Sequence, residues 1–91
     1  MHIRSDRKAL LGRARRLAGQ VKAISETIEM GEDEDCYAVM QQLAAARGAL
    51  DALTRIFLEG HIRDHVAGAK TPAARKRGGD ELVLTLRSFL K

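Results

Sequence analysis

The chain has 91 residues, enough for one small domain. With 2 Phe, 1 Tyr and 0 Trp, its core is mainly aliphatic and thin for a monomer, which favours burial of apolar side chains between subunits of an oligomer. The net charge of +4 is compatible with nucleic acid or another acidic partner, and a single cysteine, unable to form an intrachain disulfide, suits the reducing cytoplasm. No apolar run reaches the length of about 18 residues that a membrane span needs, and no apolar segment follows the basic N-terminus, so we expect neither a membrane helix nor a signal peptide.

Residues 4–30 have the pattern of an amphipathic helix. Their apolar side chains recur at alternating steps of four and three residues, which is the spacing of a seam between packed helices. This first seam consists of Leu10, Ala14, Leu17, Val21, Ile24 and Ile28. Gly31 follows as a helix stop, and an acidic turn of residues 32–35 leads to the next segment. We therefore expect the first helix to end at Met30.

A second and cleaner seam follows the acidic turn and predicts one long helix that starts near Cys36 and continues past His61. Its apolar residues, again at steps of four and three, are Val39, Leu43, Ala46, Leu50, Leu53 and Phe57. The same steps continued backward reach Cys36, and continued forward they reach His61. Two side chains that can bind metals thus lie on the seam, near opposite ends of this helix.

The spacing of Cys36, His61 and His65 predicts a metal site shared between subunits. His61 and His65 are four residues apart, so they project from one helical face, one turn apart, and could hold a transition metal together. Cys36 lies roughly 37 Å from His61 along an unbroken helix with a rise of about 1.5 Å per residue. One chain cannot close that distance, whereas two antiparallel copies related by a twofold axis would bring Cys36 of one chain to the histidines of the other.

The C-terminal part of the chain is predicted to be a connector followed by a short helix. Residues 67–79 contain glycines, a proline and a basic run. A short helical turn could start at Thr71 with Pro72 as its first residue, and Asp80 would then cap a final helix over residues 80–90. The expected fold is all-α, with two long helices and a short C-terminal helix.

Several of these stretches resemble the CsoR/RcnR/FrmR family of small all-helical bacterial repressors, which sense copper, nickel or cobalt, or formaldehyde. The resemblance covers nearly the whole chain and rests on RLAGQ at 16–20, Cys36, QQLAAARGA at 41–49 and HIRDH at 61–65. It implies a single domain over residues 1–91 and an antiparallel helical dimer that assembles into a dimer-of-dimers tetramer. It also implies that the protein binds operator DNA without a helix-turn-helix.

The resemblance further implies which inducer binds. Copper sensors of the family carry a second cysteine where this chain has His65, which argues against copper(I), an ion that prefers thiolates. Nickel and cobalt sensors carry histidine there and another near the N-terminus, where this chain has His2. The implied ligands are His2, His61, His65 and Cys36 of the partner subunit, with the Met1 amine as a further donor. This set suits Ni²⁺ or Co²⁺, and Zn²⁺ would also bind three of these groups in vitro.

Basic residues of the first helix form a candidate DNA surface on the side opposite the apolar seam. The stripe is formed by Arg4, Lys8, Arg15 and Lys22, and Arg13 and Arg16 flank it. Such a stripe is usually only a solvated face, but when an oligomer repeats it, it matches the phosphates of a duplex. The family resemblance adds Arg47 to the expected DNA contacts. The mechanism it favours is negative allostery, in which metal-free protein holds its operator and metal binding releases it.

Two other functions stay open on the sequence alone. In a formaldehyde-responsive repressor of the same family, formaldehyde would bridge the Met1 amine and Cys36; those sensors typically begin Met-Pro and often have Glu in place of the last histidine, and this chain has neither feature. The other function is a helical metal buffer or adaptor that never binds DNA, which the basic stripe disfavours. We do not expect an enzyme, because no Gly-rich phosphate loop is present and Ile62 stands where a zincin has its catalytic Glu.

Overall fold

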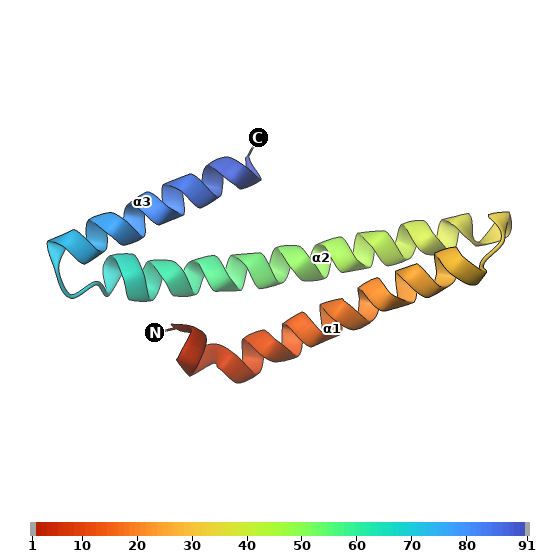
Figure 1. The fold of residues 1–91 in the computed structure, drawn as a ribbon, viewed down its shortest axis with the longest axis horizontal. Coiled ribbons are helices and arrows are strands. Elements are labelled where there is room, and N and C mark those ends of the chain that lie inside the picture. Colours follow the sequence, from red (N-terminus) through yellow and green to blue (C-terminus); the bar gives the residue numbers. More distant parts are fainter. Residues whose placement is uncertain (1, 91) are drawn as a thin grey trace. The chain divides into compact units, whose positions relative to one another are not determined.

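The computed structural model describes residues 2–90, in which every regular element is helical (Figure 1). The elements are the α-helix α1 (His2–Met30), the short 3₁₀-helix η1 (Asp33–Asp35), the α-helix α2 (Cys36–His61), the π-helix η2 (Ile62–Ala67) and the α-helix α3 (Pro72–Phe89). The all-α prediction is confirmed. None of the helices in the described range is long and apolar enough to cross a bilayer.

The chain divides into two compact units. One unit is residues 8–54, which contain most of α1 and the larger part of α2. The other unit joins the described residues 2–7 to residues 55–90, and so combines the first turns of α1 with the end of α2, η2 and α3. All three histidines belong to this second unit.

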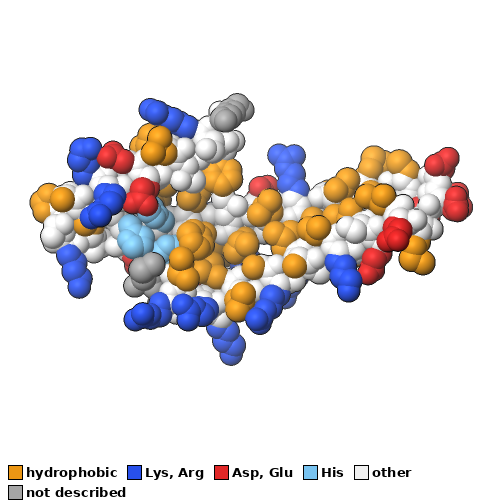
Figure 2. Space-filling model, in the orientation of Figure 1, with side chains coloured by type: hydrophobic (Ala, Val, Ile, Leu, Met, Phe, Trp, Pro, Cys, Tyr) orange, Lys and Arg blue, Asp and Glu red, His pale blue; other side chains and the backbone are white. Residues whose placement is uncertain are grey.

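Within the unit of residues 8–54, α1 and α2 form a helical hairpin whose apolar seams are only partly covered. Leu10, Ile24 and Ala46 are its buried hydrophobic residues. Other seam residues are left largely open, with Val21 and Leu50 each 50% exposed. Figure 2 shows hydrophobic side chains at the surface of the molecule. One chain alone therefore buries only part of the pattern that the sequence predicted as a packing seam.

The turn of the hairpin is closed by short-range hydrogen bonds. Gly31 N–H donates to the Thr27 carbonyl at 2.8 Å, and a Cβ atom at Gly31 would collide with that same oxygen. Glu32 and Asp35 bond reciprocally: Glu32 N–H donates to the Asp35 carboxylate at 2.9 Å, and Asp35 N–H donates to the Glu32 carbonyl at 2.9 Å. The predicted end of the first helix at Met30 is confirmed.

The prediction of a connector over residues 67–79 was wrong for most of its length. The helix α3 starts at Pro72 and runs through the glycines at 78 and 79 without a break. Thr71 caps it, because its hydroxyl accepts a hydrogen bond from Ala74 N–H at 3.0 Å, as the Thr71-Pro72 pair predicted. Asp80 is not a cap; its carboxylate accepts from Lys76 Nζ at 2.8 Å inside the helix.

Gly78 explains why a glycine lies inside α3. Its backbone approaches η2 so closely that a Cβ atom there would collide with the carbonyl oxygen of His65. Gly79 beside it has open space, since nothing lies within 4 Å of the Cβ position. The contact of α3 with η2 therefore overrides the low helix propensity of glycine.

Candidate metal centre

His2, His61 and His65 come together from three elements of the second unit. His2 is on the first turn of α1, His61 is the last residue of α2, and His65 lies in η2. Each offers an imidazole nitrogen, and these three atoms all lie within 4.8 Å of one another. An imidazole nitrogen binds Zn²⁺ at about 2 Å, so three nitrogens in this arrangement are near enough for one ion. Figure 2 shows histidine side chains, in pale blue, next to one another at the surface.

The His2 ring is held by two residues of α2. It is only 3% exposed, and it meets the ring of Phe57 edge-on, with 4.6 Å between the ring centroids and 73° between the planes. On another side it lies over Gly60, where a Cβ atom would come within 2.6 Å of His2 Nδ1. From the sequence alone, Gly60 is only a residue of low helix propensity, because its contact with His2 depends on the tertiary fold.

His61 and His65 lie where α2 passes into the π-helix. Their ring centroids are 5.1 Å apart, and the His65 ring lies 5.5 Å from that of His2. The four-residue spacing predicted this proximity, but the widened turn over Ile62–Ala67 was not predicted. Single turns of π-helix are rare and are frequently found at functional sites.

α3 contributes a backbone acceptor to the centre. His61 Nε2 and the carbonyl oxygen of Gly78 are 2.9 Å apart, so in the tautomer protonated at Nε2 the ring donates a hydrogen bond to α3. That tautomer leaves Nδ1 of His61 with a free lone pair for a metal ion. A metal-bound histidine commonly donates its other N–H to a carbonyl or carboxylate in this way.

The charge state of His2 also fits a metal ligand. Burial lowers the pKa of His2 below its usual value, and the neighbouring His65 lowers it further, while Asp64 opposes the shift. A metal ion binds the neutral imidazole, so a lowered pKa reduces the competition from protons. The donor set and its environment therefore fit a borderline divalent ion such as Ni²⁺, Co²⁺ or Zn²⁺.

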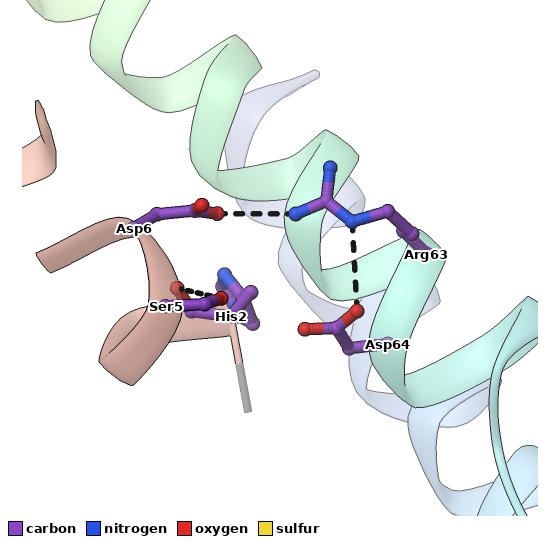
Figure 3. A network of polar contacts seen from close by, with 5 residues as sticks. All are labelled: His2, Ser5, Asp6, Arg63 and Asp64. Atoms are coloured by element: carbon purple, nitrogen blue, oxygen red, sulfur yellow. Dashed lines mark hydrogen bonds and ion pairs between the residues drawn. The ribbon is translucent and has the colours of Figure 1, made fainter.

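A polar network lies beside His2 and links the first turns of α1 to η2 (Figure 3). Arg63 Nη2 donates to the Asp6 carboxylate at 3.0 Å, and Arg63 Nε lies 3.5 Å from an oxygen of Asp64. The Ser5 hydroxyl donates to the His2 carbonyl at 3.4 Å. Sequence reasoning missed Arg63 and Asp6, because they are 57 residues apart and nothing in the sequence pairs them.

Cys36 is not part of the histidine group. It is the first residue of α2, it is exposed, and it stands at the opposite end of that helix from His61. The helix between them is unbroken, which is the condition on which the prediction of an intersubunit site depended. The Met1 amine, named from the sequence as a further donor, lies outside the described residues.

Six of the basic residues predicted for the DNA surface belong to the unit of residues 8–54, and all six are exposed. They are Lys8, Arg13, Arg15, Arg16, Lys22 and Arg47. Lys22 has an acidic neighbour, with its Nζ 4.0 Å from Glu26 one helical turn away. Lys8, Arg15 and Lys22 are seven residues apart along α1 and therefore share one helical face.

Comparisons with known proteins agree with these features. Residues 6–88 match the family described as metal-sensitive transcriptional repressor. The chain is 44% identical over 91 residues to an uncharacterised protein encoded in the bioA 5′ region of Serratia marcescens, with 99% of this chain and 98% of that protein covered. It is 33% identical over 90 residues to the transcriptional repressor RcnR of Salmonella paratyphi B, with the same coverage.

A solved structure has the same fold. It is a glutamate-to-histidine variant of the formaldehyde-responsive regulator FrmR from Salmonella enterica serovar Typhimurium. The TM-score is 0.83 and the sequence identity is 41%, with 94% of this chain and 96% of the FrmR chain covered.

Proposed function

The chain belongs to the CsoR/RcnR family of metal-sensitive transcriptional repressors, and we propose that it holds operator DNA in its metal-free form and releases it on binding Ni²⁺ or Co²⁺. The family consists of transcriptional repressors and not of enzymes. We base the choice of inducer on one observation: imidazole nitrogens of His2, His61 and His65 lie within 4.8 Å of one another. Three imidazoles favour a borderline divalent ion over copper(I).

In this proposal Cys36 of the partner subunit completes the centre. Its thiol is exposed at the start of α2, so it is accessible to a second copy of the chain. One thiolate with three imidazoles is a donor set that Ni²⁺ and Co²⁺ accept, and the Met1 amine would add a fifth donor. Zn²⁺ would bind three or four of these groups tetrahedrally in vitro.

The proposed assembly is a homotetramer built as a dimer of antiparallel dimers. It is supported by the apolar side chains that one hairpin leaves open, among them Val21, Leu43 and Leu50. Exposed apolar surface of this kind is typical of protein–protein interfaces. We propose that residues 1–91 act as one functional domain of this assembly, in the cytoplasm.

The proposed DNA surface is the exposed basic stripe of α1 together with Arg47. These side chains would neutralise backbone phosphates, so affinity for DNA should fall steeply with salt, and the operator sequence would be read partly through DNA shape. Metal would draw the first turns of α1, which carry His2, and the α2 helices of two subunits into one coordination sphere. That would shift the basic stripes relative to the phosphates and weaken DNA binding.

Fluorescence anisotropy of DNA from upstream of the gene tests the proposal. Metal-free protein should bind this DNA, and Ni²⁺ or Co²⁺ should weaken binding by about 5-fold to 150-fold, the usual range of allosteric coupling. The response should be lost in Cys36→Ala and in His61→Ala. Unchanged operator affinity with either metal would contradict the nickel and cobalt assignment, and binding that is absent at low salt would favour a metal buffer instead.

A second candidate inducer is formaldehyde, which the similarity to FrmR favours. Formaldehyde would join the Met1 amine and the Cys36 thiol through one methylene carbon, and its oxygen would leave as water with one proton from the amine and one from the thiol. A parallel arm of the same titration with formaldehyde, followed by intact-mass measurement, separates the two inducers. Operator release by formaldehyde alone, with a methylene cross-link in the protein, would move the chain to the aldehyde-sensing branch.

A further inference from the structure

The first turn of α1 is an unusual place for a buried metal ligand. Chain termini are poorly ordered unless other contacts hold them, and the first turn of α1 contains no acidic residue that would interact favourably with the helix dipole. His2 is nevertheless almost fully buried. Something beyond the helix itself must therefore fix the position of this turn.

Asp6 is the charged group placed to do this. It follows His2 by four residues in α1, so both side chains project from the same face of the helix. Its carboxylate accepts a hydrogen bond at 3.0 Å from Arg63, which lies in η2 between His61 and His65 (Figure 3). His2 on this face therefore lies next to His61 and His65, and Asp6 forms an ion pair with Arg63 in the same short segment.

Arg63 is itself held in place by Asp64, whose carboxylate lies 3.5 Å from Nε. The planar guanidinium therefore faces two carboxylates, one on η2 and one on α1. Apart from the pair between the neighbours Arg63 and Asp64, each of the other ion pairs within residues 2–90 joins two residues that are four apart on one helix. Of the ion pairs within residues 2–90, only Arg63–Asp6 joins segments that are distant in the sequence.

We propose that Arg63, acting through Asp6, is a positioning residue that holds His2 beside His61 and His65 before the metal arrives. This inference rests on the proposed metal-sensing function. The side chains of Arg63 and Asp6 are 60% and 38% exposed, so the pair contributes little to global stability. Its effect is local: it limits the positions available to His2 and so lowers the entropy lost when a metal binds.

The test uses the full-length protein and Co²⁺ as the probe, because Co²⁺ reports its ligands in its visible absorption spectrum. Arg63→Gln and Asp6→Asn should each weaken Co²⁺ binding by about 3-fold to 10-fold, an effect between those of an exposed ion pair and of a residue that directly orients a metal ligand. The spectrum should shift toward that of His2→Ala. The matched control is Arg55→Gln, which removes a similarly exposed arginine whose ion pair, to Glu59, stays within α2; it should change neither property.

A double-mutant cycle shows whether Arg63 acts through His2. In a His2→Ala background, Arg63→Gln should cause no further loss of Co²⁺ affinity. An equal loss with and without His2 would overturn the proposal, and so would an Arg63→Gln variant with wild-type affinity and spectrum.

Hydrogen exchange of the metal-free protein gives a readout that needs no metal. Arg63→Gln should speed amide exchange in the peptide that covers residues 2–7, while the melting temperature stays unchanged. Unaltered exchange there would count against the positioning role. If wild-type protein binds neither Co²⁺ nor Ni²⁺, the proposed function fails, and the exchange measurement still decides whether Arg63 orders the N-terminal turn.

Discussion

Gly60 leaves the space that the His2 ring occupies. A Cβ atom at this position would lie 2.6 Å from Nδ1 and 3.0 Å from Cγ of His2, which is closer than such atoms pack. The ring also has Phe57 against it, so it cannot retreat in that direction. A methyl group at residue 60 would therefore displace His2 from the other two histidines.

We expect Gly60→Ala to weaken Co²⁺ or Ni²⁺ binding by about 10-fold, in the range found when residues that orient metal ligands are lost. Because alanine is the better helix former by about 1 kcal/mol, the helix itself should not be destabilised. Metal competition titration and thermal unfolding measure the two effects. Gly12→Ala is the matched control, since nothing lies within 4 Å of that Cβ position in α1; equal metal affinity in both variants would refute the role of Gly60.

The sequence identified the candidate ligands better than their surroundings. The four-residue spacing of His61 and His65 predicts their proximity in any helical context, and the family resemblance pointed to His2. Gly60 and Arg63 could not be assigned in the same way, because each acts through a contact with the distant N-terminal turn. Such contacts exist only once the chain has folded.

The helix α3 lies against η2 through Gly78, a glycine inside the helix. Gly78 is buried, its carbonyl oxygen faces His61 Nε2, and its Cα side faces the His65 backbone. The sequence predicted a break here, because glycine pairs usually interrupt helices. The cap at Thr71 and the packing on η2 outweigh that preference, so α3 starts well ahead of the predicted cap at Asp80.

The two glycines of α3 make a matched pair for unfolding measurements. Gly78→Ala should lower the free energy of unfolding by about 1–3 kcal/mol, the usual cost of forcing an extra carbon into a packed contact. Gly79→Ala should raise it by up to about 1 kcal/mol, because the Cβ position is open and alanine favours the helix. Urea denaturation of the metal-free protein measures both. Changes of the same sign in the two variants would contradict the close approach of α3 to η2.

The π-helix is the other element that the sequence did not predict. The residues from Ile62 to Ala67 continue directly from α2, and no proline or glycine lies among them to mark a change. Apolar periodicity distinguishes helices from strands, but it does not distinguish a single wide turn from the α-helix around it. The widened turn therefore had to be found in the structure.

The apolar seams of α1 and α2 are only partly used within one chain. Leu10, Ile24 and Ala46 are buried, whereas Leu43 and Leu50 stay about half exposed. The sequence predicted both seams correctly as apolar stripes, but it did not show which residues pack within the chain. The residues left open are the ones that the proposed assembly would cover.

We expect Leu50→Glu to break the assembly into smaller species, because burying an unpaired carboxylate in an apolar interface is strongly unfavourable. Sedimentation or light scattering of wild-type and variant protein at equal concentration measures the mass. Ser25→Glu is the control, since it adds the same charge at an exposed polar residue of the hairpin. An unchanged mass for Leu50→Glu would show that this part of α2 lies outside the subunit interface.

The unbroken course of α2 limits which changes of its sequence the proposed metal site can tolerate. If Cys36 of the partner subunit meets His61, two antiparallel copies must cross halfway between these residues, at Gly48 and Ala49. Both residues are small, and apart from chain neighbours and the backbone of α2 itself, nothing in residues 2–90 lies within 4 Å of the Gly48 Cβ position. The length of α2 then sets how Cys36 of one chain is aligned with the histidines of the other. A substitution along α2 leaves this alignment unchanged, whereas insertion or deletion of even one residue would turn the cysteine away from the histidines.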